Sequence, residues 1–226
     1  MIRNLKVLCL AAMALGVFGV INVGSAHAAE ELFHCEVQPC RLTTTTDGTE
    51  ETAHHVFVVK NANKESISFT CDDLTGEATA EGKTEEDITL TNIAYDHCTT
   101  VLGTTTVDMN GCDYRFNSKG GGTDAATVTI NCPEGKKIEV TASATCTVNV
   151  GPQGPLKGIG YHTLGAGGAR EVTVTAKVPG IAVTVTGSCG TFKLTPPYTA
   201  EYTTGNTIVT AEKDNANKEM VACWWE

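Results

Sequence analysis

Short segments in which apolar and polar residues alternate recur along the chain, and they predict β-strands. Valine, isoleucine, leucine or phenylalanine occupies one parity, and threonine or another polar residue occupies the other. Successive side chains of a strand point to opposite faces, so each segment has one apolar and one polar face. Such strands are typical of antiparallel sheets that cover a core on one side. The clearest segments are 55–59, 66–69, 87–91, 126–130 and 171–176.

Turn-forming residues separate these segments, and no long stretch has helical periodicity. Closely spaced strands joined by Gly, Pro and Asn turns favour a sandwich or a barrel-like sheet. We therefore expect an all-β, antiparallel fold. The predicted turns lie at 61–63, 75–76, 110–111, 133–135, 179–180 and 205–206.

Five cysteines share the parity of the apolar residues in their own or a neighbouring segment, namely Cys71, Cys112, Cys132, Cys146 and Cys189. Their thiols are therefore expected to point inward, among the core side chains. A reactive cysteine needs exposure and a positive neighbourhood. These cysteines are accordingly predicted to be disulfide staples or small core residues, and not nucleophiles.

The first 28 residues have the pattern of a secretory signal peptide. Arg3 and Lys6 precede an apolar run at 7–23, and small residues lead to a predicted cleavage after Ala28. No second apolar stretch of about 18 residues follows, so no transmembrane helix is predicted. We expect the mature region, 29–226, to be secreted or held at the cell surface.

Acidic residues outnumber basic ones, with a net charge of −10. Cleavage removes Arg3 and Lys6 and leaves 14 basic and 26 acidic residues, a net charge of −12. A surface this acidic disfavours nucleic acid and anionic membranes as partners. A loose similarity between the segments 56–71 and 172–189 would, if it is a duplication, divide the mature region into 29–133 and 134–226.

Export predicts disulfide bonds, because disulfides persist outside the cytosol. An odd number of cysteines remains after cleavage, so one thiol is unpaired or pairs between chains. Cys35 and Cys40 flank Pro39 at a spacing that fits a small loop disulfide better than a zinc site. The segments 112–116 and 126–132 are expected to pair as a hairpin with Cys112 opposite Cys132, although Cys146 competes for Cys132. The candidates are Cys35, Cys40, Cys71, Cys98, Cys112, Cys132, Cys146, Cys189 and Cys223.

The sequence contains no assembled catalytic or metal-binding motif, and no cofactor is predicted. His54 and His55 are adjacent, so on a strand they face opposite ways, and a metal site would need His97 or His162 to converge on one of them. Acidic residues cluster at 50–51, 72–73 and 85–87, and a glycosidase would need two of their carboxylates to face each other in a cleft. Of the tryptophan pair Trp224 and Trp225, we expect one to pack and the other to be exposed.

Several stretches of the chain resemble a family of secreted, threonine-rich and cysteine-containing β-proteins of soil actinobacteria that have no characterised activity. The resemblance implies an exported all-β protein and no catalytic residue or ligand. It rests on 33–35 with 39–40, and on 53–57, 68–71, 107–116, 131–138 and 202–206.

We therefore expect an exported, non-catalytic extracellular or cell-surface protein with a structural or binding role toward an unknown ligand. Its binding surface is expected at the loop tips around Gly120 and Gly167, at the acidic turns or at the exposed tryptophan. The alternative is a secreted hydrolase that uses carboxylates or a histidine-bound metal. A secreted inhibitor or toxin-like effector is a third hypothesis, which a disulfide scaffold permits.

Overall fold

The computed structural model describes residues 32–46, 54–118, 126–143, 145–165 and 170–225. All regular elements in these ranges are strands, and all their pairings are antiparallel, which confirms the predicted fold class. The predicted signal peptide and the loops around Gly120 and Gly167 lie outside the described residues.

The strands are numbered in chain order. They are β1 (Phe33–Cys35), β2 (Cys40–Thr45), β3 (His55–Lys60), β4 (Ser66–Cys71), β5 (Asp73–Ala80), β6 (Thr84–Glu85), β7 (Asp87–Asp96), β8 (Thr99–Thr100), β9 (Gly103–Thr104), β10 (Thr106–Asp108), β11 (Asp113–Asn117), β12 (Ala126–Asn131), β13 (Ile138–Ser143), β14 (Cys146–Val150), β15 (Gln153–Leu164), β16 (Glu171–Ala182), β17 (Thr184–Gly187), β18 (Thr199–Lys213), β19 (Met220–Val221) and β20 (Cys223–Trp225).

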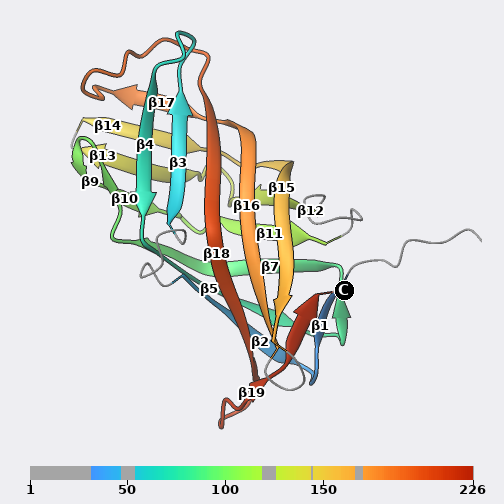
Figure 1. Ribbon diagram of the computed structural model, residues 1–226. Helices are drawn as coiled ribbons and strands as arrows, with labels where there is room; N and C mark the ends of the chain where they lie inside the picture. The colour runs from blue at the N-terminus through green and yellow to red at the C-terminus, as the bar shows by residue number, and fades with distance from the viewer. Residues whose placement is uncertain (1–31, 47–53, 119–125, 144, 166–169, 226) are drawn as a thin grey trace, which may run out of the picture.

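Eight strands form a closed antiparallel barrel in the order β16-β15-β12-β11-β7-β5-β2-β18, and the pairing of β18 with β16 closes it. The long strand β18 makes this possible because its two halves have different partners. The second half of β18 pairs with β2, which is a strand of the barrel. Its first half pairs with β3, and β3, β4, β8 and β9 extend the sheet beyond the barrel. Figure 1 shows β4, β3, β18, β16 and β15 side by side in front, in this order from left to right.

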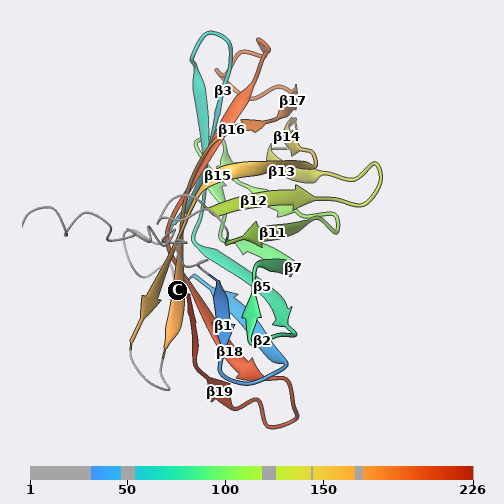
Figure 2. The same cartoon turned by 90° about the vertical axis from the view of Figure 1, so that its right-hand side faces the viewer.

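A second sheet, of order β10-β13-β14-β17, lies behind β3 and β4, and its strands run crosswise to them (Figure 1). Figure 2 shows the same two layers from the side. A small third sheet, β20-β1-β6, lies beside β2 near the opposite end and adds Phe33 to the core. The fold is therefore a barrel that continues at one end into two facing layers. The possible division near residue 133 stays a prediction.

The alternating pattern predicts burial correctly in β4 and β12, whereas in β16 Thr173 is buried and Val174 is half-buried, against the pattern. In β12, for example, Ala126, Val128 and Ile130 are buried, while the intervening threonines are half-buried. Three predicted turns are wrong, because 75–76, 179–180 and 205–206 lie inside β5, β16 and β18. A Cβ at Gly76 would come within 2.9 Å of the Leu90 side chain, so this glycine permits close approach of neighbouring strands. Gly180, with a φ of +76°, lies at a register shift of β16.

Four disulfides staple this fold: Cys35–Cys40, Cys71–Cys98, Cys112–Cys132 and Cys146–Cys189. The predicted hairpin is confirmed, because Tyr114 pairs with Ile130 and the Cα atoms of Cys112 and Cys132 are 4.1 Å apart. Of these cysteines only Cys132 is not fully buried. The ninth cysteine of the predicted mature chain, Cys223, is buried and unpaired, and burial raises the pKa of its thiol to about 11.

Candidate functional site

A cavity of about 160 Å³ lies inside the fold, where the barrel continues into the two layers. Its walls come from the barrel strands, from β3 and β4, and from β10, β13 and β14 of the second sheet. An eight-stranded barrel is just wide enough either to be filled by side chains or to hold one small ligand. In other proteins an apolar cavity of roughly 150 Å³ binds benzene. The space is therefore sufficient for a small organic molecule.

Most of the cavity wall is apolar. Several large side chains of the wall belong to the core and still keep accessible surface, namely Phe57, Ile88, Val107, Phe116, Leu156 and Val174. Side chains that are packed on one side and bare on the other indicate space that the protein itself does not fill. Among the described residues, the lining holds no Lys or Arg, and Glu86 is its one carboxylate. Such a wall suits an apolar molecule.

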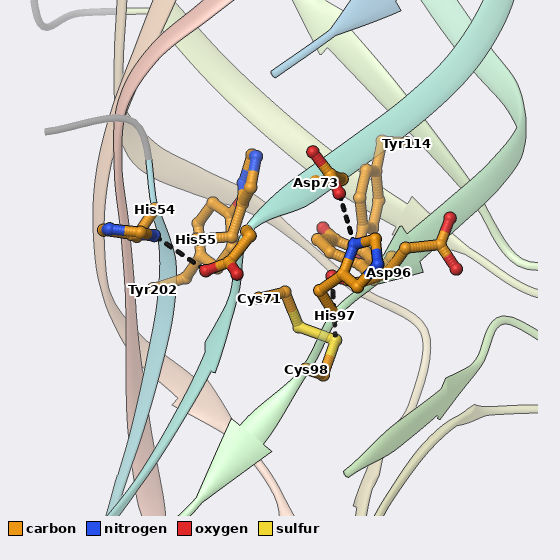
Figure 3. Close-up of a disulfide and its surroundings, with 11 residues drawn as sticks. His54, His55, Cys71, Asp73, Asp96, His97, Cys98, Tyr114 and Tyr202 are labelled. Carbon is orange, nitrogen blue, oxygen red and sulfur yellow. Dashed lines mark hydrogen bonds and ion pairs between the residues drawn. A yellow bond between two sulfur atoms is a disulfide. The ribbon is translucent and has the colours of Figure 1, made fainter. Parts of the chain in front are cut away.

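A polar cluster interrupts this apolar wall, and strand register positions it. His55 on β3 lies opposite Cys71 on β4 and Thr204 on β18, so the three side chains share the face that lines the cavity. Tyr202, two residues before Thr204, has the same parity and also lines the cavity. Figure 3 shows His55 beside Tyr202, with Tyr114 farther to the right and the Cys71–Cys98 disulfide below them.

Hydrogen bonds join these polar groups into two networks. The Nε2 atom of His55 lies 2.7 Å from Oγ1 of Thr46, which donates to Oγ1 of Thr207 at 3.2 Å. The Nδ1 atom of His55 hydrogen-bonds with the hydroxyl of Tyr202. Tyr95 and Tyr114 form a separate pair, in which the two hydroxyl oxygens are 3.2 Å apart. The first network therefore joins β3 to β18, and the second joins β7 to β11.

Burial keeps the cluster uncharged. It lowers the pKa of His55 to about 4, although the nearby Asp73 carboxylate acts in the opposite direction. Burial also raises the pKa of Tyr95, Tyr114 and Tyr202 well above the ordinary value. These tyrosines nevertheless keep accessible surface. All three tyrosines line the cavity.

Two histidine–aspartate pairs lie outside this cluster, on the solvent side. Nδ1 of His54 lies 2.9 Å from Asp72, and Nδ1 of His97 lies 2.6 Å from Asp73 (Figure 3). The expectation that His54 and His55 diverge is confirmed, because His55 is buried and His54 is half-buried beside Asp72. In the part of the chain that the structure describes, no three His, Cys, Asp or Glu side chains are arranged to hold a metal ion.

The other residues considered from the sequence lie away from the cavity polar cluster. His162 is exposed on β15, and Asp87, from the acidic cluster at 85–87, forms an ion pair with Arg115. The acidic residues at 50–51 lie outside the described residues. The expectation that one tryptophan is exposed is wrong, because both are half-buried. Trp224 stacks on His34 and has the Arg170 guanidinium 4.6 Å from its ring centre, and Trp225 packs against Tyr161.

Sequence reasoning missed the tyrosines. Tyr114 shares its parity with Cys112 and Phe116, so its inward direction was readable from the pattern. The sequence did not show that Tyr114 lies near Tyr95 and Tyr202. The three residues are on three different strands, and the arrangement of these strands depends on closure of the barrel.

Comparisons with known proteins add no identification: no family model, no curated protein and no solved structure matches the chain. Among the described residues, no helix is long and apolar enough to span a membrane.

Proposed function

We propose that this chain is an exported, non-catalytic binding protein whose barrel holds a small, largely apolar molecule. The observation that carries the proposal is the cavity of about 160 Å³, lined by half-buried aromatic and aliphatic side chains. It moves the expected binding site from the surface loops to the interior of the barrel.

The apolar character of the wall supports this proposal. A ligand that packs against these side chains would remove apolar surface from water, and its binding would stabilise the folded state by mass action.

Export is part of the same proposal. Four disulfides fit an oxidising compartment, and the N-terminal pattern predicts cleavage after Ala28. Membership of the secreted actinobacterial family remains a proposal on the residues that carry the resemblance. A rigid, stapled barrel in an extracellular setting is suited to capture or carry a poorly soluble compound.

The test uses naphthalene as a neutral apolar probe on the purified, oxidised protein. We expect saturable binding by calorimetry and a concentration-dependent rise in melting temperature. Val174→Phe places a ring in the cavity and should abolish both effects, whereas Lys177→Phe, at an exposed position of the same strand, should leave them unchanged. Val107→Phe fills the cavity from the second sheet and provides an independent blocking variant. Absence of binding, or binding that neither filling variant reduces, would contradict the proposal.

A further inference from the structure

We propose that the molecule held in the barrel is uncharged and carries a hydrogen-bond acceptor, such as a carbonyl oxygen, that receives the hydroxyl proton of Tyr161. This inference rests on the proposed function and specifies the class of ligand. It follows from the position of Tyr161 on β15, from its unpartnered hydroxyl, and from the partners that the other tyrosines of the wall already have.

Strand register directs the side chain of Tyr161 into the barrel. Tyr161 lies two residues after Ile159 on β15, so the two side chains share one face of the strand. Tyr161 also lies directly opposite Val174 on β16, and opposite residues of an antiparallel pair share a face. Ile159 and Val174 both line the cavity, as Tyr161 does. The hydroxyl, at the far end of the Tyr161 side chain, therefore lies on the inner side of the barrel wall.

The hydroxyl of Tyr161 has no hydrogen-bond partner among the described residues, and burial alone raises its pKa. The residue is only 4% exposed, and its ring packs against Trp225 with 5.5 Å between the ring centres. The hydroxyl oxygen nevertheless keeps accessible surface, so a molecule in the cavity can reach it. The Oγ1 atom of Thr204 also lacks a partner, but neighbouring atoms cover it almost completely and a ligand cannot contact it.

The other tyrosines of the wall are already partnered. Tyr202 hydrogen-bonds with His55, and Tyr95 with Tyr114. Tyrosine hydroxyls in protein interiors usually have such a partner, because an O–H group that leaves water without gaining an acceptor destabilises the folded state. Among the described residues, Tyr161 is thus the tyrosine of the lining whose proton is left for a ligand.

A charged acceptor does not suit this wall. Among the described residues the lining includes no Lys or Arg, and its histidine is uncharged at neutral pH because burial lowers the pKa of His55 to about 4. Both ring nitrogens of His55 are also hydrogen-bonded within the protein. A carboxylate would therefore exchange its hydration for one bond from a neutral hydroxyl. A ketone or an ester loses far less hydration and needs only one donor, so it is the better match.

The experiment compares acetophenone with α-methylstyrene, in which a methylene group replaces the carbonyl oxygen and the shape is kept. Calorimetry at pH 7 measures the binding of both compounds to the wild type and to Tyr161→Phe. Removing the Tyr161 hydroxyl should lower the affinity ratio of ketone to hydrocarbon by roughly two- to tenfold, the net effect of one hydrogen bond. The affinity for α-methylstyrene should not fall, because phenylalanine keeps the ring. Benzoate, the anionic counterpart of acetophenone, should bind the wild type at least tenfold more weakly than acetophenone.

Tyr114→Phe is the matched control, because Tyr114 also lines the cavity but its hydroxyl is paired with that of Tyr95. In this variant the ratio of ketone to hydrocarbon affinity should not fall below that of the wild type. A fall in Tyr114→Phe but not in Tyr161→Phe would overturn the inference, and so would tighter binding of benzoate than of acetophenone.

Chemical unfolding without ligand separates ligand binding from a structural role of the hydroxyl. Because the Tyr161 hydroxyl has no partner in the protein, Tyr161→Phe should unfold at the same denaturant concentration as the wild type or at a higher one. A lower midpoint would show that the hydroxyl is bonded within the protein and would overturn the inference. Naphthalene binding together with an unchanged ratio of ketone to hydrocarbon affinity in Tyr161→Phe would refute this inference alone, whereas no naphthalene binding would refute the proposed function.

Discussion

Acid should destabilise this protein through one buried imidazole, His55. Its side chain is 2% exposed, and desolvation lowers its pKa from 6.5 to about 4 in the folded state. Between these two values the unfolded chain binds a proton at this residue and the folded protein does not. The contribution of His55 to stability is therefore fully present above pH 6.5, falls as the pH drops, and is lost by about pH 4.

The size of the effect follows from the pKa shift. Each pKa unit corresponds to about 1.4 kcal/mol, so a shift from 6.5 to about 4 amounts to about 3 kcal/mol of unfolding free energy. His97 acts in the opposite direction, because its hydrogen bond with Asp73 raises the pKa of its imidazole. Its stabilising effect is lost as the pH rises from 6.5 through that raised value.

The assay is chemical unfolding at several pH values between 4 and 7.5, under oxidising conditions, for the wild type and His55→Gln. Glutamine keeps a neutral donor and acceptor in the cluster but does not titrate. His162→Gln, which removes an exposed imidazole from β15, serves as the reference variant. We expect the difference between wild type and His55→Gln to change by about 3 kcal/mol across this range. If the difference in unfolding free energy between the two proteins changes by less than about 1 kcal/mol across this pH range, the reasoning is refuted.

Further predictions concern the cysteines and catalysis. Replacing Cys146 and Cys189 with serine should lower the unfolding free energy by about 4 kcal/mol, because this disulfide closes a loop of 43 residues. Replacing Cys35 and Cys40 should lower it by about 2 kcal/mol, because that loop spans 5 residues. Equal losses in chemical unfolding would contradict this order. Cys223 should resist iodoacetamide at pH 8 and react only in denaturant, since it is buried and its thiol pKa is about 11; labelling of the native protein, measured by mass spectrometry, would show an open site. Glycosidase, esterase and peptidase substrates should give only background rates, and turnover that disappears with a single substitution would support the hydrolase alternative. The substitutions to test are at His54, His55, His97, Asp72 and Asp73.

The sequence was sufficient for the fold class and for local pairings. Alternation is a property of a strand itself, so it identified the buried face of β12 without knowledge of its neighbours. The β11–β12 hairpin was also predictable, because its two strands are adjacent in the chain and each carries a cysteine at its end. Local rules failed at Gly76 and Gly180, since a glycine that permits close strand approach or a bulge has the same sequence signal as a turn.

The cavity could not be predicted, because the position of its polar side chains depends on non-local register. Tyr95 and Tyr114 lie on β7 and β11, whereas Tyr202 lies on β18, and the two groups meet only across the interior of the barrel. A hydrophobic pattern also carries no information about the volume of the space between inward-facing side chains. It shows that Phe57 and Val174 face inward, but it does not show that the space between such side chains is left unfilled.

A crystal structure of the oxidised protein with naphthalene would test the central claim most directly. Our account predicts one ligand molecule inside the barrel, with its ring among Phe116 and Val174. A cavity that collapses, or one that holds only water while naphthalene lies on the surface, would contradict it.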